Sequence, residues 1–467
     1  MKKRVLFISF ILISIVSLSQ ITSGNKFVDE YLNQEKVSQE AIVYQFQPQN
    51  KAERVLESVM KETILTLSKE ELAFFVDEIP NANWGHPCRY IAVNTKTGTV
   101  RSEHRLMPPS NLQLWDMVYG TLPKVEGKCF DFKKLNQYGA KNPPAGLTPD
   151  KCYAVIISGG SSLAINHVRY WNDCQAIYNA LTYEYGYLDS HIYVLMSDGT
   201  NPAVDRHLID DTYDSSPLDL DGDGDNDVQY PATKSAISQV FNTLSTIINN
   251  DDYLFVYTID HGSVTGNGEA LLCLWGENMT TTEFNAEINK IHSDDINIIM
   301  GQCYSGGFVS PLNKVGRVIT TACEADELSW AHTGLFYDEF VYYWTAAVYG
   351  EDPYGNPVNA DSNNDGYVTM AEAYNYATIH DETGEHPNFL SNKPFLGQFT
   401  TLLGMQPCNT FNVQNWNITT NSGVLACKVK ISNSSVSNGA SFRVITASET
   451  TITQGFKVEL GSTLKIQ

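Results

Sequence analysis

The chain has 467 residues, of which 42% are hydrophobic, and this suits a globular protein of two or three domains better than a disordered one. Its formal net charge is -22, which disfavours nucleic acid as a partner. Much of the acid excess gathers in loops suited to a hard cation. The alternative is a solvated acidic surface that favours solubility.

The first residues are typical of a secretion signal. A basic start over residues 2–4 precedes an almost wholly apolar run over residues 5–16, and Ser19 is small enough to end a signal-peptidase site. The run is short for a bilayer span of about 20 residues. We therefore expect residues 1–19 to be a signal peptide, the protein to be secreted or displayed at the cell surface, and the mature chain to have no transmembrane span.

Residues 20–145 have a mixed pattern that predicts an N-terminal α+β region. A helical stretch is expected around 52–75, and residues 90–101 alternate like two strands around the turn 96–98. The segment 141–146, Lys-Asn-Pro-Pro-Ala-Gly, is typical of a linker. The place of this region before the linker is compatible with a removable propeptide.

Residues 146–403 predict an α/β domain. Apolar strand-like runs alternate with helical patterns, in which one helical face carries Cys174, Ile177, Tyr178 and Leu181, and another carries Ile237, Val240, Phe241 and Leu244. The expected strands are 153–157, 192–196, 253–259, 296–300 and 318–321. Such alternation favours a mostly parallel sheet sandwiched by helices.

Residues 404–467 predict a small all-β module. The composition changes to Ser, Thr, Asn and Val, and the segment 439–444 recurs loosely as 461–466. This rhythm fits either a small sandwich or a short solenoid. Nine cysteines leave at least one unpaired if the others pair, and we expect Cys408 and Cys427 to be the readiest bridge.

Two of the expected strands end in reactive residues. Tyr253–Ile259 leads into Asp260-His261-Gly262, and the next strand leads into Cys303 followed by Tyr-Ser-Gly-Gly. Strand ends line the ligand crevice of an open parallel sheet, and a rigid strand holds the next residue still while it faces the crevice. His261 and Cys303 are therefore candidates for an acid/base and a nucleophile.

These residues resemble the legumain-type cysteine peptidases, relatives of caspases, gingipains and clostripain, over residues 151–344. Four ordered matches carry the resemblance: 153–160 with Asn166 and Asp173-Cys174; Asp260-His261-Gly262-Ser263; Cys303 with Ser305-Gly306; and 319–322 leading to Glu327, Ser329, Trp330 and Ala331. The resemblance implies a caspase-like fold and a protein or peptide substrate.

The resemblance also implies catalytic roles. Cys303 is expected to attack the scissile carbonyl, and His261 to protonate the leaving amine and then assist water. The backbone N–H groups of Gly262 and Cys303 are expected to stabilise the oxyanion. Asn166 falls where the family has an Asn that orients the His, although its side chain could instead cap the next helix.

The substrate pocket departs from the legumain pattern. Tyr304 stands where legumains carry an acidic residue that helps to recognise asparagine, and Arg169 stands one place later than the family's Arg. Asp338 matches the family's distal acid only loosely. A pocket set by Arg169 favours a polar or acidic P1 side chain, whereas Asp338 favours the opposite charge. The expected substrate-binding residues are Arg169, Tyr304, Glu327, Ser329, Trp330 and Asp338.

Residues 361–372 fit a calcium loop at every ligand position, with Gly366 at position six. The expected ligands are Asp361, Asn363, Asp365, the Tyr367 carbonyl, Thr369 and bidentate Glu372. A helix over 371–380 is expected to follow. A metal-free Asp/Asn-rich surface turn is the alternative.

A second acidic loop has calcium-loop spacing but carries Tyr230 where an EF-hand has Glu. Its candidate Ca²⁺ ligands are Asp219, Asp221, Asp223, Asp225 and Asp227. These carboxylates repel one another without a counter-charge, so calcium is expected to stabilise the domain. A solvated acidic loop is again the alternative.

The leading hypothesis is a secreted, calcium-stabilised cysteine endopeptidase made as a precursor. A transpeptidase or ligase of the same family uses the same acyl-enzyme and is not separable by sequence. A third hypothesis is a non-catalytic calcium-dependent surface-binding protein on a peptidase scaffold, for which a lost His or Cys is the usual sign. Both residues are present here.

Overall fold

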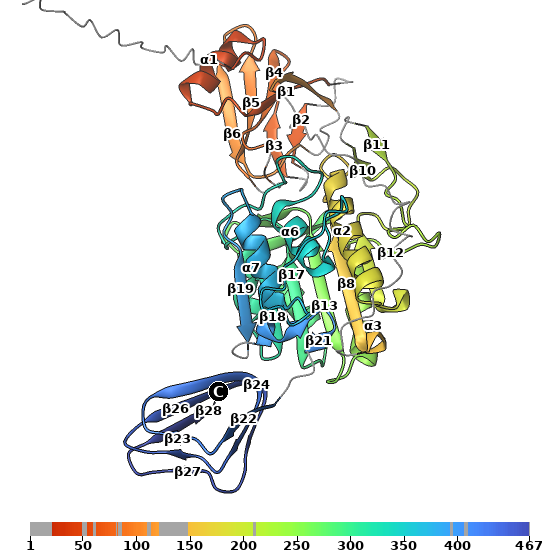
Figure 1. Cartoon of the computed structure of the whole chain (residues 1–467). Coiled ribbons are helices and arrows are strands. Elements are labelled where there is room, and N and C mark those ends of the chain that lie inside the picture. Colours follow the sequence, from red (N-terminus) through yellow and green to blue (C-terminus); the bar gives the residue numbers. More distant parts are fainter. Residues whose placement is uncertain are drawn as a thin grey trace, which may run out of the picture.

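The computed structural model describes residues 21–48, 54–58, 62–80, 82, 86–109, 114–120, 148–208, 212–392, 396–405 and 410–466. The predicted signal peptide and linker lie outside these residues. Figure 1 shows an N-terminal domain at one end, a central domain in the middle and a small C-terminal module at the other end. No helix of the described residues is long and apolar enough to cross a membrane.

The N-terminal domain is one helix on an antiparallel sheet of strand order β6-β5-β4-β1-β7. Strands β2 and β3 form a separate hairpin. Asn25 caps the helix by accepting hydrogen bonds from the backbone of the first turn. The elements are α1 (Lys26–Gln34), β1 (Ile42–Phe46), β2 (Val55–Glu57), β3 (Thr63–Thr66), β4 (Glu71–Asp77), β5 (Cys88–Asn94), β6 (Val100–Arg105) and β7 (Trp115–Tyr119).

The helix predicted around 52–75 is wrong, because this stretch forms β2, β3 and β4. Residues 73–77 of β4 are all buried, so the strand lacks the polar and apolar alternation that marks a half-exposed strand. The two strands predicted within 90–101 are confirmed as β5 and β6. Gly98 adopts a φ of 75° in their turn, a conformation that favours glycine.

The central domain is built on a seven-stranded sheet of order β12-β9-β8-β13-β17-β18-β19. All neighbours pair in parallel except β18 and β19, which are antiparallel. The predicted mostly parallel sheet is therefore confirmed. Its strands are β8 (Cys152–Ser158), β9 (Ile192–Met196), β12 (Val228–Tyr230), β13 (Tyr253–Ile259), β17 (Asp295–Met300), β18 (Arg317–Thr321) and β19 (Asn388–Asn392).

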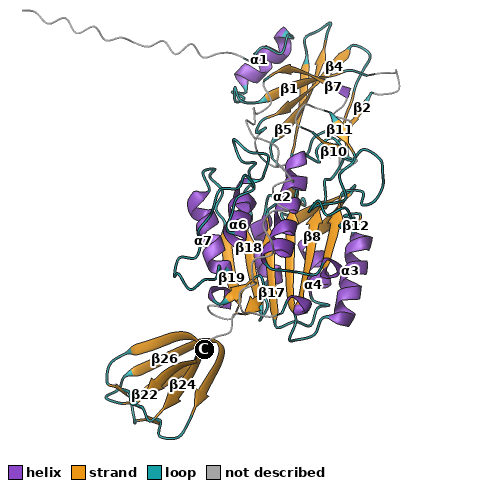
Figure 2. Ribbon diagram, turned by 45° about the vertical axis from the view of Figure 1, so that its right-hand side comes forward, coloured by secondary structure: helices purple, strands orange, loops and turns teal. Residues whose placement is uncertain are grey.

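Helices cover both faces of this sheet (Figure 2). One buried layer joins α2, α6 and α7 to Ala154 and Ile156 of β8, and the other joins α3, α4 and α5 to Val155 and Ile157. Side chains thus alternate between the two layers along a strand that is buried on both sides. The helices are α2 (Val168–Asn179), α3 (Lys234–Ile247), α4 (Thr281–Ile288), α5 (Val309–Leu312), α6 (Glu339–Tyr349) and α7 (Met370–His380).

Short strands decorate the central domain. A three-stranded antiparallel sheet of β14, β15 and β16 directly follows β13. The remaining short strands form two pairs, β10 with β11 and β20 with β21. Their bounds are β10 (Arg206–His207), β11 (Tyr213–Asp214), β14 (Gly262–Val264), β15 (Ala270–Leu274), β16 (Glu277–Thr280), β20 (Thr400–Thr401) and β21 (Gly404–Met405).

The C-terminal module is a stack of parallel strands, which favours the solenoid alternative over a sandwich of antiparallel strands. One sheet has the order β22-β24-β26-β28 and the other β23-β25-β27. Phe442 pairs with Leu464, so the 22-residue repeat is the stacking register. The strands are β22 (Thr410–Gln414), β23 (Asn417–Ile418), β24 (Ser422–Ser432), β25 (Ser435–Val436), β26 (Ser441–Ile452), β27 (Lys457–Val458) and β28 (Thr463–Ile466).

The cysteines of the described residues differ in whether they form a disulfide. Cys427 is disulfide-bonded, and Cys408, its predicted partner, lies outside the described residues. The free cysteines of the described part are all buried, and they are Cys88, Cys152, Cys174, Cys273, Cys303 and Cys323. Cys303 is thus not disulfide-bonded.

Candidate active site

Cys303 and His261 lie just beyond two neighbouring parallel strands. The last paired residues are Thr258 of β13 and Met300 of β17, and each chain continues for only three residues to the candidate side chain. Gly262 packs against the backbone of Cys303, because a Cβ atom on Gly262 would lie 1.9 Å from the Cys303 carbonyl oxygen. The glycine after His261 is therefore required by this close approach.

The His261 imidazole makes contacts at both ring nitrogens. Its Nε2 lies 2.7 Å from the backbone carbonyl oxygen of Ile165, and its Nδ1 lies 3.2 Å from the Tyr170 hydroxyl. If Nε2–H donates to the carbonyl, Nδ1 accepts from Tyr170. His261 is 0% exposed, and burial lowers the pKa of its imidazole well below the usual range.

Asn166 does not make the contact with His261 that the sequence suggested. Its side-chain Nδ2 donates to Ser197 Oγ at 2.7 Å and to the Asp205 carbonyl at 2.6 Å. Nor does it cap the next helix, because His167 occupies the N-cap position of α2. The neighbouring Ile165 supplies the acceptor for His261 instead, so Asn166 fixes the loop rather than the ring.

Asp260 holds the turn into His261. It has a φ of 131°, a region that side-chain-bearing residues rarely adopt. Its carboxylate accepts from the backbone N–H groups of His261 and Gly160 and from Ser158 Oγ at 2.5–3.1 Å. Burial raises the pKa of Asp260 to about 7 although these hydrogen bonds favour the charged form.

The Cys303 thiol lies against the backbone of Ser329. The Ser329 N–H is 3.3 Å from Sγ and its carbonyl oxygen is 3.7 Å away. Cys303 is 0% exposed, and burial raises the pKa of its thiol well above the usual value. Trp330, the next residue, donates its backbone N–H to Glu385 Oε2 at 3.2 Å. The predicted loop 329–330 therefore lines the thiol.

Arg169 and Asp338, which the sequence offered as alternative determinants of the pocket's charge, form an ion pair. Arg169 Nε lies 3.3 Å from Asp338 Oδ1, and both side chains are largely buried. The Asp338 backbone N–H donates to the carboxylate of Asp173, whose pKa is raised by burial and by the charge of Asp338. Arg169 also donates to the Tyr170 hydroxyl at 2.6 Å. The expected substrate pocket thus contains one arginine and two carboxyl groups that contact one another.

Tyr304 and Glu327 are joined through their backbones. Tyr304 adopts a φ of 58°, and its N–H donates to the Glu327 carbonyl at 2.8 Å. The Glu327 carboxylate instead contacts His386 Nδ1 at 2.7 Å, and that His side chain is 70% exposed. Tyr304 therefore lies at the site, whereas the Glu327 side chain is directed toward the surface.

Several residues of the site were not identified from the sequence. Ile165 acts through a backbone carbonyl, which gives no sequence signal. Asp173 stood in the first family match without an assigned role, whereas the sequence did not single out Tyr170 and Glu385, which are also buried. Tyr170 had a usable signal, because it lies four residues after Asn166. Glu385 lies 82 residues after Cys303 and comes close only through the fold.

The loop 361–372 is closed by hydrogen bonds between its side chains and its own backbone. Asp361 accepts from the Gly366 N–H at 2.8 Å, and Gly366 adopts a φ of 90°. Glu372 lies in the first turn of α7, where its two oxygens accept from the backbone and hydroxyl groups of Ser362 and Thr369. The carboxyl group at position twelve therefore reaches back to the loop. The predicted helix after the loop is confirmed.

The loop 219–227 brings three of its five acids together. Carboxylate oxygens of Asp219, Asp221 and Asp227 lie within 4.8 Å of one another. Asp221 and Asp227 are buried, and among the described residues no Lys or Arg pairs with the three. Asp223 and Asp225 stay exposed outside this group. This oxygen-rich, uncompensated cluster fits a hard cation.

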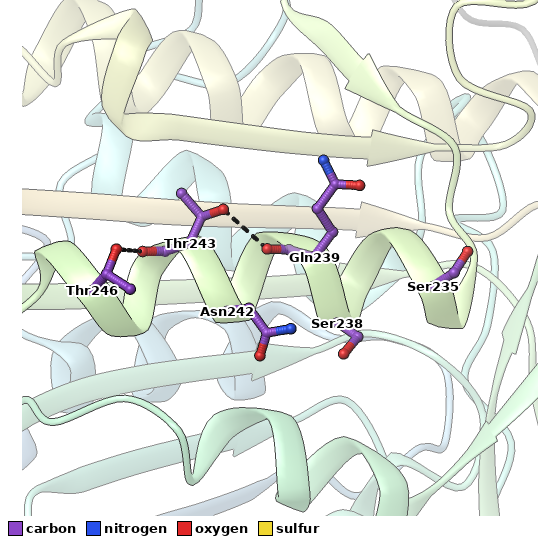
Figure 3. A pocket seen from close by; sticks show the side chains of 6 residues that line it. All are labelled: Ser235, Ser238, Gln239, Asn242, Thr243 and Thr246. Atoms are coloured by element: carbon purple, nitrogen blue, oxygen red, sulfur yellow. Dashed lines mark hydrogen bonds between the residues drawn. The ribbon is translucent and has the colours of Figure 1, made fainter.

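A surface hollow along α3 lies apart from all these residues. Figure 3 shows that it is lined by polar side chains of one helix, with Thr243 Oγ1 donating to the Gln239 carbonyl. Its lining is Ser235, Ser238, Gln239, Asn242, Thr243 and Thr246. No titratable side chain lines it, so it offers no acid or base to activate its hydroxyl groups.

A parallel sheet between helix layers, with His and Cys beyond adjacent strands, defines a caspase-like cysteine peptidase scaffold. The sequence profile of the Peptidase C13 family matches residues 152–388, just over half of the chain. The protein belongs to the Peptidase C13 family, whose members are cysteine peptidases, and this confirms the resemblance to legumains.

Other comparisons add little. No curated protein matches the chain. A crystal structure of a protein from Geobacter sulfurreducens is similar at 11% sequence identity and a TM-score of 0.33, covering 55% of this chain and 97% of that chain. This likeness is too weak to bear on function.

Proposed function

We propose that this protein is a secreted cysteine endopeptidase in which Cys303 is the nucleophile and His261 the acid/base. The arrangement of Cys303 and His261 beyond neighbouring strands, with His261 Nε2 anchored on the Ile165 carbonyl, carries the proposal. That anchor leaves Nδ1 as the nitrogen available for proton transfer once Tyr170 releases it. Export is inferred from the basic and apolar first residues alone.

In the proposed reaction, the Cys303 sulfur attacks the scissile carbonyl carbon and its proton passes to His261 Nδ1. The backbone N–H groups of Gly262 and Cys303 support the resulting oxyanion. His261 then gives the proton to the leaving amine as the C–N bond breaks. Water, deprotonated by His261, attacks the thioester carbonyl, and the Cys303 thiol is regenerated with the carboxylic acid product.

We also propose that the protein binds Ca²⁺ at its two acidic loops and is stabilised by it. Asp219, Asp221 and Asp227 would supply carboxylates at the loop 219–227, where they lie within 4.8 Å of one another. At the loop 361–372 the ligands would be Asp361, Asn363, Asp365, the Tyr367 carbonyl, Thr369 and Glu372. Calcium at the loop 219–227 would offset the repulsion between its acids beside Tyr178, which hydrogen-bonds Asp227 at 2.6 Å.

The test of the peptidase proposal is covalent labelling by a thiol-reactive peptide probe. The protein is compared with Cys303→Ala and His261→Ala variants, after partial proteolysis has removed the N-terminal domain. We expect labelling at Cys303 in the native sequence, none in Cys303→Ala and at least 100-fold slower labelling in His261→Ala. Equal labelling of all three proteins would reject the assignment.

A further inference from the structure

The N-terminal domain, here α1 with β1–β7, shares a hydrophobic core with the central domain. Phe75 and Trp115 of its sheet belong to the same buried cluster as Ala164 and Ile165, which follow β8. Ile165 is 0% exposed, and its carbonyl oxygen is the acceptor for His261 Nε2. One residue thus packs into the N-terminal core and holds the candidate catalytic ring.

A second contact lies on the other side of the thiol. Ala82 of the N-terminal domain forms an antiparallel β-bridge with Trp330. Trp330 directly follows Ser329, whose N–H is 3.3 Å from Cys303 Sγ. An extended peptide that adds to a strand edge makes this kind of backbone pairing. Ala82 therefore occupies the place that such a peptide would take beside the nucleophile.

His86 anchors this part of the N-terminal domain. Its side chain is 1% exposed and its Nε2 lies 2.8 Å from Asp77 Oδ1, which ties the segment after Ala82 back to strand β4.

Together these contacts cover the candidate catalytic pair, and both Cys303 and His261 are 0% exposed. We propose that the N-terminal domain is a built-in inhibitor, which holds the Ala82 backbone in the substrate's place beside Trp330 until the domain is displaced or cut away. This inference rests on the proposed peptidase function.

The alternative is that the N-terminal domain is a permanent part of the enzyme and leaves Cys303 accessible in solution. Four samples of the protein separate the two: the full chain, Ala82→Pro, Ala82→Ser, and the full chain after limited trypsin digestion and removal of the N-terminal fragment. Proline at position 82 removes the N–H that donates to the Ile79 carbonyl at 3.0 Å and so distorts the segment that forms the bridge, whereas serine retains this donor. Alkylation of Cys303 by iodoacetamide at pH 7.5 and hydrolysis of unfolded casein are measured for each.

We expect both rates to be at least tenfold higher in Ala82→Pro and in the trimmed protein than in the full chain and Ala82→Ser. Equal rates in the full chain and the trimmed protein would contradict the inhibitory role of the N-terminal domain but not the peptidase function. If both rates are high in the trimmed protein but low in a folded Ala82→Pro variant, the proposal that the backbone at Ala82 blocks the site is wrong. If Cys303 is alkylated but no sample hydrolyses casein, both the proposed peptidase function and the inhibitory role of the N-terminal domain are wrong. If Ala82→Pro does not fold, the comparison of the trimmed protein with the full chain shows whether the N-terminal domain covers Cys303.

Discussion

The Tyr170 hydroxyl lies 3.2 Å from His261 Nδ1, while the Arg169 guanidinium donates to the same hydroxyl at 2.6 Å. The Tyr170 ring also stands edge-on to the imidazole, with centroids 5.0 Å apart. A proton donor on Nδ1 stabilises the neutral ring and opposes its protonation. Tyr170 is therefore a positioning residue for the proposed acid/base.

We predict that Tyr170→Phe moves the acidic limb of the kcat/KM profile to higher pH in the trimmed enzyme. The phenyl ring keeps the packing, but the loss of the hydroxyl removes a hydrogen bond that favours neutral His261. The shift is expected to be on the order of half a pH unit to one unit, equivalent to about 1 kcal/mol. Tyr185→Phe is the matched control, because that hydroxyl bonds the Val348 carbonyl within the core. An unmoved limb in Tyr170→Phe would contradict the prediction.

Arg169 offers a second prediction, on stability. Arg169→Ala would leave Asp338 and Asp173 buried together without their cation, and removing one partner of a buried pair costs about 3–5 kcal/mol. We expect the melting temperature of a Cys303→Ala background to fall by on the order of 5–10 °C. Arg101→Ala is the control, since its pair with Glu71 is 45% exposed on the Arg side and should contribute under about 1 kcal/mol. Similar melting temperatures for both variants would rule out a structural role for Arg169.

The sequence predicted five of the seven strands of the central sheet, because continuous apolar runs such as Tyr253–Ile259 are long enough to be recognised, and it missed the edge strands β12 and β19. It also predicted Cys303 and His261, since each follows such a run. It misassigned β4, where burial on both sides removes the alternation, and it chose Asn166 over the adjacent Ile165. A backbone carbonyl carries no side-chain signal. The pairing of Ala82 with Trp330 spans 248 positions and depends on the docking of one domain on another.

Asp260 makes stability depend on pH. Burial raises its pKa to about 7 from an ordinary value of 3.8, so the folded chain holds this proton more tightly than the unfolded chain. The contribution of Asp260 to stability is then greatest below about pH 4 and falls as the pH rises to about 7. We expect Asp260→Asn to lose this part of the pH dependence of the melting temperature between pH 4 and 8.

The same variant should be less stable at low pH, because an amide cannot accept all the hydrogen bonds that reach the Asp260 carboxyl. The expected loss is about 1–3 kcal/mol. Asp251→Asn, at an exposed position, is the control and should follow the native protein at every pH. The assignment fails if Asp260→Asn and the native protein show parallel melting curves over the whole pH range.

Calcium binding at the loop 361–372 can be separated from helix capping. Glu372 forms a capping box with Thr369 at the start of α7, and Glu283 forms the same motif with Thr280 at the start of α4, outside any acidic loop. Glu372→Gln keeps the size of the side chain but removes the charge of the bidentate ligand, so calorimetry should show calcium affinity lowered at least tenfold for one class of site. Glu283→Gln should lower helix stability by a similar small amount and leave calcium binding unchanged. If both variants bind calcium as the native protein does, the carboxylate of Glu372 serves only as a helix cap.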